Sequence, residues 1–70
     1  MTLKKRSFSL SRHRTSVALE EEFWTVLEHE AARDKKSLAA VVAEIDSKRG
    51  MRPLASALRL YALAAASRAL

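Results

Sequence analysis

Residues 14–19 alternate between polar and apolar side chains, which predicts one short β-strand in a chain whose later patterns are helical. Thr15, Val17 and Leu19 share one face of this strand. A lone strand of this length leaves backbone N–H and C=O groups without partners, and burying such groups is costly. The strand must therefore pair with something, and the simplest partner is the same strand of a second copy across a two-fold axis.

The small size of the chain also favours self-association. A domain of 70 residues buries only ~60% of the surface that it exposes when unfolded, so a monomer has little core. The sequence has no Cys, which excludes disulfides and thiolate metal sites. Two His residues without a supporting carboxylate pattern do not complete a zinc site. We therefore expect a homodimer with no metal and no cofactor.

The N-terminal region is basic, and its structure is less clearly defined by the sequence. Residues 1–6 are predicted to be a flexible basic arm. Phe8 and Leu10 alternate with serines, but they occupy even positions, whereas Thr15, Val17 and Leu19 occupy odd ones. One strand cannot keep both sets on one face without a bulge or a turn, which we place at residues 11–13. Whether residues 7–11 form an extra strand stays open, and no internal repeat is apparent.

Two helices are predicted after this strand. The first begins directly after Leu19 and ends near Asp34, with acidic residues at the end where the helix dipole favours them. Ser37 is a natural N-cap for the second, and Gly50 is placed to terminate it. The residues from 7 to 50 are therefore expected to form one domain.

A third helix is predicted in the alanine- and leucine-rich residues 54–70, with Pro53 suited to its first turn. Together with the link that precedes it, this helix forms the C-terminal segment 51–70, which packs on or extends the same domain. Its apolar stripe consists of Leu54, Leu58, Tyr61 and Ala65, widened by Leu60, Leu63 and Ser67.

The charge of the chain favours acidic partners. Its net charge is +5, and the first 14 residues contain five Lys or Arg and no acid. Nucleic acid is the first candidate partner and anionic lipid the second. No segment has the ~20 uncharged apolar residues that span a membrane, and no secretory signal is present, so we expect a cytoplasmic protein. No nucleophile, acid–base or glycine-loop pattern indicates an enzyme.

The sequence resembles the ribbon-helix-helix DNA-binding family in residues 14–20, Phe23-Trp24 and residues 36–38. The block of residues 13–17, with Phe23-Trp24 and residues 56–59, is similar to a bacterial subgroup that has an extra C-terminal helix. The resemblance implies a mainly α fold with one short N-terminal β-strand. Two intertwined chains would form a homodimer with a two-stranded antiparallel ribbon, and each chain would add a third helix.

The resemblance also implies roles for individual residues in a DNA-binding regulator of transcription that acts as a repressor. Outward-facing strand residues contact bases, namely Arg14, Ser16 and Ala18. Phosphate contacts come from the start of the second helix and the basic residues near it, namely Arg12, Lys35, Lys36, Ser37 and Leu38. The dimer core would consist of Thr15, Val17, Leu19, Phe23, Trp24, Leu27, Leu38, Val41, Val42 and Ile45.

Two other functions stay open. The chain could be a protein-interaction module, or an antitoxin, whose residues 54–70 dock a partner protein, because alanine-rich helices allow close approach. It could also bind anionic membrane surfaces as a basic amphipathic protein, although the strand and the acidic first helix argue against this.

Overall fold

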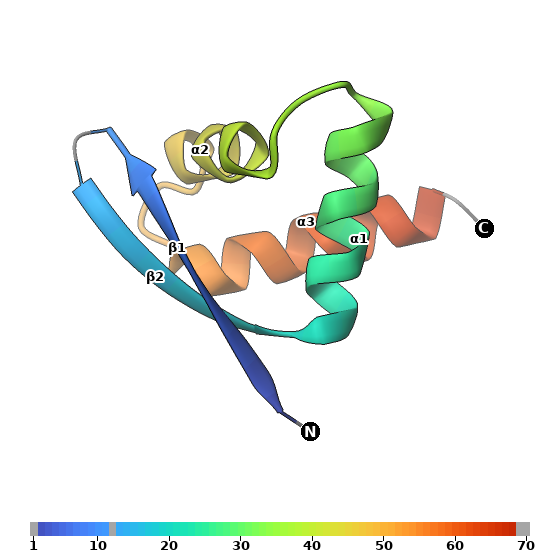
Figure 1. Ribbon diagram of the computed structural model, residues 1–70, viewed down its shortest axis with the longest axis horizontal. Helices are drawn as coiled ribbons and strands as arrows, with labels where there is room; N and C mark the ends of the chain where they lie inside the picture. The colour runs from blue at the N-terminus through green and yellow to red at the C-terminus, as the bar shows by residue number, and fades with distance from the viewer. Residues whose placement is uncertain (1, 12, 69–70) are drawn as a thin grey trace.

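The computed structural model describes residues 2–11 and 13–68 as a two-stranded antiparallel sheet followed by three helices (Figure 1). The strands are β1 (Leu3–Leu10) and β2 (His13–Glu20), and the helices are α1 (Glu21–Arg33), α2 (Leu38–Lys48) and α3 (Leu54–Arg68). The three helices pack against one another, and α2 and α3 also contact the strands. The fold therefore has two layers, with one face of the hairpin against the helices.

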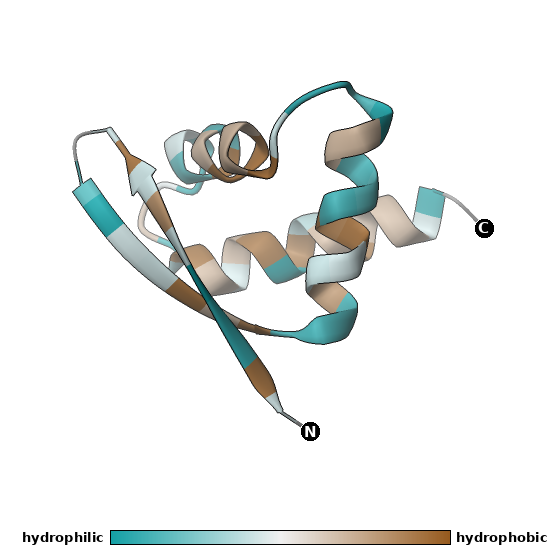
Figure 2. Cartoon of the chain, viewed as in Figure 1, coloured by the Kyte–Doolittle hydropathy of each residue, from teal (hydrophilic) through white to brown (hydrophobic). Residues whose placement is uncertain are grey.

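The prediction of a single strand and a flexible arm was wrong. Residues from Leu3 to Arg6 form the first half of β1 instead of an arm. Phe8 and Leu10 are buried on the same side as Val17 and Leu19 of β2. The change of parity between the two sets is a chain reversal, which Ser11 begins with a positive φ of 44°. Apolar and polar residues alternate in the second half of β1, whereas its first half is mostly hydrophilic (Figure 2).

The partner of the predicted strand is also different from the one expected. β2 pairs along its whole length with β1 of the same chain, from Leu3 opposite Glu20 to Leu10 opposite His13. The backbone groups of β2 that face β1 are satisfied within the chain, so a second copy is not needed to complete the ribbon. Within one chain the ribbon is therefore the hairpin of β1 and β2, and the intertwined homodimer stays a prediction.

The helix ends follow their local signals. Ser37 has an extended backbone, and its Oγ accepts a hydrogen bond from the Ala40 amide at 3.0 Å, which confirms the predicted N-cap. Asp34 follows the last residue of α1, as expected. Gly50 adopts a φ of +61° just after α2, a conformation that costs glycine least.

The third helix supplies part of the core. Leu58 and Ala62 are buried in one cluster with Trp24, Leu27 and Val42. The remaining members of this cluster come from the strands: Phe8, Leu10, Val17 and Leu19.

The expected stripe of α3 was too wide. Leu60 is 46% exposed and Leu63 is 60% exposed, so neither belongs to the buried face. Ala65 is buried as expected, Ala57 and Ala62 are buried as well, and these small side chains suit the contact between α3 and α1. Within residues 2–11 and 13–68, no helix has both the length and the apolar character needed to cross a bilayer.

Candidate nucleic-acid interface

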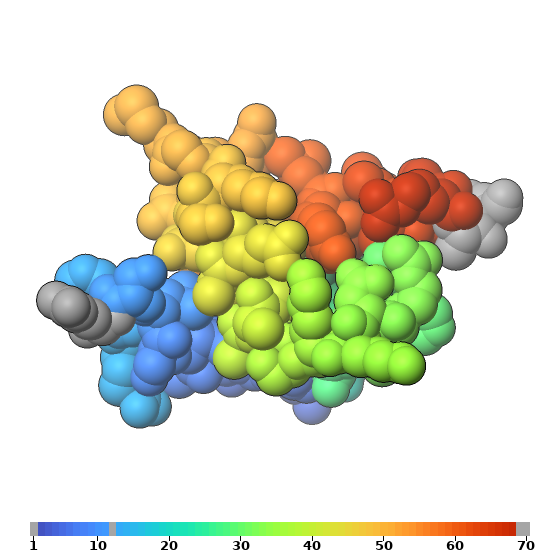
Figure 3. Space-filling model, turned by 90° about the horizontal axis from the view of Figure 1, so that it is seen from above, coloured from blue at the N-terminus to red at the C-terminus, as the bar shows by residue number. Residues whose placement is uncertain are grey.

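The hairpin has one face that the helices do not cover. Its six central residues are defined here as the ribbon face. They alternate with the buried residues, and all are exposed except the half-buried Ala18. The ribbon face consists of Lys5, Ser7 and Ser9 from β1 and Arg14, Ser16 and Ala18 from β2. In the view from above, the strand residues lie at the end of the molecular surface opposite the C-terminal end of α3 (Figure 3).

The pairing register fixes which side chains meet across this face. Ser7 lies opposite Ser16, and their hydroxyl oxygens are 3.0 Å apart, which is hydrogen-bond distance. Lys5 lies opposite Ala18, and Ser9 lies opposite Arg14. Each cation is thus next to a small side chain on the neighbouring strand, so both long basic side chains have open space around them.

The hairpin separates its charges by face. On the side toward α1, Lys4 Nζ lies 3.3 Å from a Glu21 carboxylate oxygen, and Arg6 Nη2 lies 3.4 Å from Glu28 Oε1. The Arg6 guanidinium also lies 5.0 Å from the centre of the Trp24 ring. Cations that point toward the helices are therefore neutralised.

The cations of the ribbon face are different. Among the residues that the structure describes, Lys5 and Arg14 form no ion pair, and the ribbon face contains no acid. Glu20 would follow Ala18 on this face, but its Oε1 accepts a hydrogen bond from Arg59 Nε at 3.0 Å. A hydrogen bond with its own backbone, together with Arg59, lowers the pKa of Glu20. The ribbon face therefore has an uncompensated positive charge.

The family model of the ribbon-helix-helix domain matches residues 3–66 of the chain. The chain belongs to the ribbon-helix-helix family. The matched region begins at the first residue of β1 and includes most of α3, so both are part of the family domain. No curated protein and no solved structure matches the chain.

The strand of the ribbon-helix-helix domain places the predicted base-contact residues together. Arg14, Ser16 and Ala18 all lie on the ribbon face, as the alternation of β2 requires. The half of this face that comes from β1 was missed, namely Lys5, Ser7 and Ser9. Arg12, a predicted phosphate contact, lies outside the described residues.

A repeat in the sequence could have revealed the missing half. Residues 5–10 read KRSFSL and residues 14–19 read RTSVAL, so a basic residue, a serine, an apolar residue, a small residue and a leucine recur at the same offsets. Only Ser7/Ser16 and Leu10/Leu19 are identical, which hides the repeat from a search for identity. The repeat becomes clear when residues are compared by type and by face.

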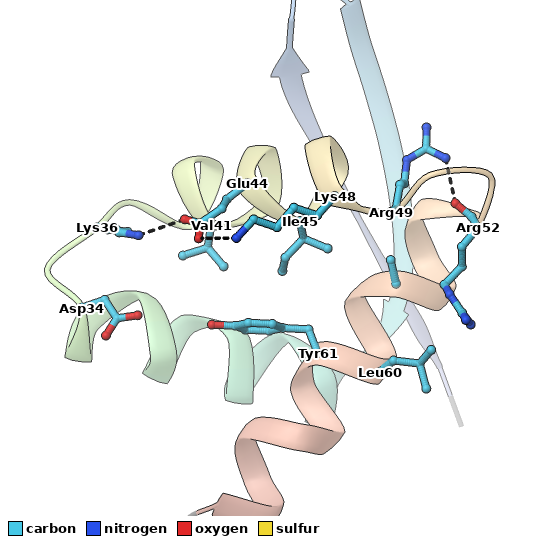
Figure 4. Close-up of a pocket in the computed structure, with 11 residues that line it drawn as sticks. Asp34, Lys36, Val41, Glu44, Ile45, Lys48, Arg49, Arg52, Leu60 and Tyr61 are labelled. Carbon is cyan, nitrogen blue, oxygen red and sulfur yellow. Dashed lines mark hydrogen bonds and ion pairs between the residues drawn. The ribbon is translucent and has the colours of Figure 1, made fainter.

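The predicted phosphate site at the start of α2 is only partly available. The first amides of a helix have no acceptor within it, and here they include Leu38 N. Lys35 has a φ of 56° and forms no ion pair among the described residues. Lys36 instead donates to Glu44 Oε2 at 2.9 Å, beside a hollow of about 320 Å³ between α2 and α3 (Figure 4). This hollow has apolar walls that include Ile45 and Leu60, and its charged residues form its rim.

Lys36→Met is expected to reduce the acid sensitivity of the fold. The hydrogen bond from Lys36 lowers the pKa of Glu44 and raises the pKa of Lys36. A lowered carboxyl pKa stabilises the fold above its ordinary value of 4.5, and this contribution is lost as the pH falls through the folded-state value. The free energy of unfolding, measured with urea, should therefore decrease more steeply for the wild type than for the variant between about pH 5 and pH 3. If the free energies of unfolding of the two proteins changed equally with pH, the Lys36–Glu44 pair would not contribute to acid sensitivity.

The residues predicted for a dimer core are buried or half-buried within one chain. Buried members of the set are Val17, Leu19, Trp24, Leu27, Val41 and Val42, and half-buried members are Thr15, Phe23, Leu38 and Ile45. The described residues contain no cluster of three or more His, Cys, Asp or Glu that could hold a metal ion.

Proposed function

We propose that this ribbon-helix-helix protein binds double-stranded DNA and represses transcription, with the ribbon face inserted in the major groove. A two-stranded ribbon fits this groove, where base edges present distinct donors and acceptors. The observation that supports the proposal is the division of charge on the hairpin. Cations that face the helices are paired, whereas Lys5 and Arg14 on the ribbon face are unpaired among the described residues.

The residues of β2 suit different contacts with the bases. The Arg14 guanidinium can donate two hydrogen bonds to one guanine, and the Ser16 hydroxyl can donate or accept. Ala18 can contact a thymine methyl group. The free amides at the start of α2, with Lys35, are suited to a phosphate beside the groove. Lys36 and Arg12 are proposed to add charge near the backbone, and Lys36 must share its charge with Glu44.

Arg14→Ala is expected to weaken binding to the cognate site by about 1–3 kcal/mol, or roughly 5- to 150-fold, because a buried base contact is lost. Fluorescence anisotropy with a duplex from the protein's own upstream region, compared with a scrambled duplex, measures this. Wild-type affinity should fall with salt at a log–log slope of ~0.9 per neutralised phosphate. In a reporter strain, Arg14→Ala should relieve repression of the same upstream region.

Arg52→Ala is the matched control. It removes the same charge from the connection between α2 and α3, where Arg52 is exposed and outside the hairpin. We expect a small loss that is equal on both duplexes. Equal losses for the two variants would reduce the role of Arg14 to general electrostatics. No binding at low salt would overturn the proposed function.

The partner-docking alternative rested on the close approach that an alanine-rich helix allows. Ala57, Ala62 and Ala65 are buried within the chain, so this face is occupied by the protein's own core. We therefore do not propose a partner role for residues 54–70.

A further inference from the structure

The hollow between α2 and α3 shares no residue with the ribbon face. Its volume is about 320 Å³. Small-molecule sites in proteins have volumes from about 300 Å³ upward, and an apolar cavity of about 150 Å³ can hold benzene. The hollow therefore has room for one aromatic ring with a short substituent.

The walls of the hollow are apolar and include an aromatic ring. Val41 and Ile45 of α2 point across the hollow toward Tyr61, whose ring lies between the two helices (Figure 4). Leu60 continues the wall on α3 and is 46% exposed. An apolar ligand seated here would cover the exposed part of Leu60 and would contact both helices, so burial would favour its binding.

Positive charge predominates around the hollow. Both of its acids are already paired: Glu44 with Lys36 at 2.9 Å and Lys48 at 3.5 Å, and Asp34 with Arg33 at 3.8 Å. The charged residues that line it are the acids Asp34 and Glu44 and the cations Lys36, Lys48, Arg49 and Arg52. The rim therefore attracts an anion and repels a cation.

Arg52 has the most available of these charges. Its backbone is held, because its amide donates to the Arg49 carbonyl at 3.1 Å and its carbonyl accepts from Arg49 Nη1 at 2.8 Å. Its side chain forms no ion pair with any residue that the structure describes, whereas Arg49 pairs with Asp46 at 2.7 Å. The Arg52 side chain extends toward the Leu60 side of the hollow (Figure 4). A guanidinium group beside an apolar wall suits a carboxylate, to which it can donate two parallel hydrogen bonds.

We propose that the hollow binds a small aromatic carboxylate. Its ring lies between Tyr61 and the side chains of α2, and its carboxylate meets Arg52 at the rim. The ring supplies the apolar surface that the walls can bury, and the carboxylate supplies the charge that the rim lacks. This site is independent of the proposed DNA binding, and its test uses the protein without DNA.

Phenylacetate is the probe for this site. Titrated into isotope-labelled protein and followed by the NMR shifts of backbone amides, it should give saturable shifts in α2 and α3 around the hollow, with a Kd of about 1 mM or tighter. Phenylacetamide keeps the ring without the charge, and phenethylamine reverses the charge. Both should bind at least about 10-fold more weakly, because a charge-assisted hydrogen bond is lost.

Three results of this titration would overturn the proposal. The first is the absence of shifts around the hollow at millimolar phenylacetate. The second is equal binding of phenylacetate and phenylacetamide, which would remove the role of the charge. The third is shifts at Lys5 and Arg14 instead of the hollow, which would indicate general attraction of anions to exposed cations.

Leu60→Asp and Leu63→Asp are a matched pair of variants on α3. Leu60 lines the hollow, whereas Leu63 is 60% exposed and does not. Leu60→Asp removes apolar wall and places a carboxylate near Arg52, so it should weaken phenylacetate binding at least about 10-fold. Leu63→Asp should leave binding unchanged. Circular dichroism checks that both variants keep their helices, and equal losses for the two would overturn the proposal.

A second copy of the chain is the competing occupant of the hollow. If its side chains filled the space, sedimentation would show a dimer that Leu60→Asp dissociates and Leu63→Asp leaves intact. Phenylacetate would then cause no shifts around the hollow in the dimer. This combination would overturn the small-molecule site and would leave the proposed DNA binding unaffected.

Discussion

Leu58→Ala is expected to destabilise the domain by about 2–5 kcal/mol, the usual cost of removing a buried leucine side chain and leaving a cavity. Leu58 is fully buried and belongs to the same cluster as Leu27 and Val42, so α3 is part of the core of the ribbon-helix-helix domain. A domain of this length has roughly 4–10 kcal/mol of total stability. Urea unfolding followed by the fluorescence of Trp24, the chain's single tryptophan, measures the loss.

Leu63→Ala is the control for this prediction, because it makes the same chemical change on the same helix. Leu63 is 60% exposed, so its variant should stay within about 0.5 kcal/mol of the wild type. Equal losses at the two positions would contradict the orientation of α3. A Leu58→Ala protein as stable as the wild type would show that the burial of Leu58 does not stabilise the domain.

The parts of the fold that were predicted correctly have local causes. Ser37 was recognised as a cap because a hydroxyl before an apolar helical pattern accepts a hydrogen bond from the first turn, as it does here from Ala40. Gly50 was recognised because glycine tolerates the positive φ that often follows a helix. These signals involve residues a few positions apart, so the sequence alone defines them.

The partner of β2 could not be predicted in this way. The lysines and Arg6 in the first half of β1 make this segment look like a solvated arm. The ion pairs of Lys4 with Glu21 and of Arg6 with Glu28, and the hydrogen bond from Trp24 to the Lys4 carbonyl, form only in the folded chain. The repeat at an offset of nine residues was present, but it consists of similar residue types rather than identical residues.

In the candidate site, too, features set by neighbouring residues were predicted, and features that depend on the folded chain were not. The alternation of β2 was enough to place Arg14, Ser16 and Ala18 on one exposed face. Lys36 was expected to be available for phosphate, but its pairing with Glu44 depends on how the chain turns between α1 and α2. Leu60 fits a helical stripe by spacing and still faces solvent, because α3 buries alanines where it meets α1.

Trp24→Ala is expected to have the largest effect on stability, about 3–5 kcal/mol, which would leave much of the chain unfolded. The side chain is 1% exposed and is the largest in the core. It also joins α1 to β1 in three ways, through the hydrogen bond to the Lys4 carbonyl, the contact with the Phe8 ring and the Arg6 guanidinium over its own ring. Its loss should therefore release β1 as well as create a cavity.

Two further variants separate these effects. Trp24→Phe keeps an aromatic ring but removes the Nε1 donor, so it should cost about 1–2 kcal/mol and speed hydrogen exchange chiefly in β1. Phe23→Ala removes the neighbouring aromatic side chain, which is only half-buried, and should cost less than Trp24→Ala. If Trp24→Phe left exchange in β1 unchanged, the hydrogen bond to Lys4 would not hold the strand. β1 would then be held by the burial of Phe8 and Leu10 and by the ion pairs of Lys4 and Arg6 with α1.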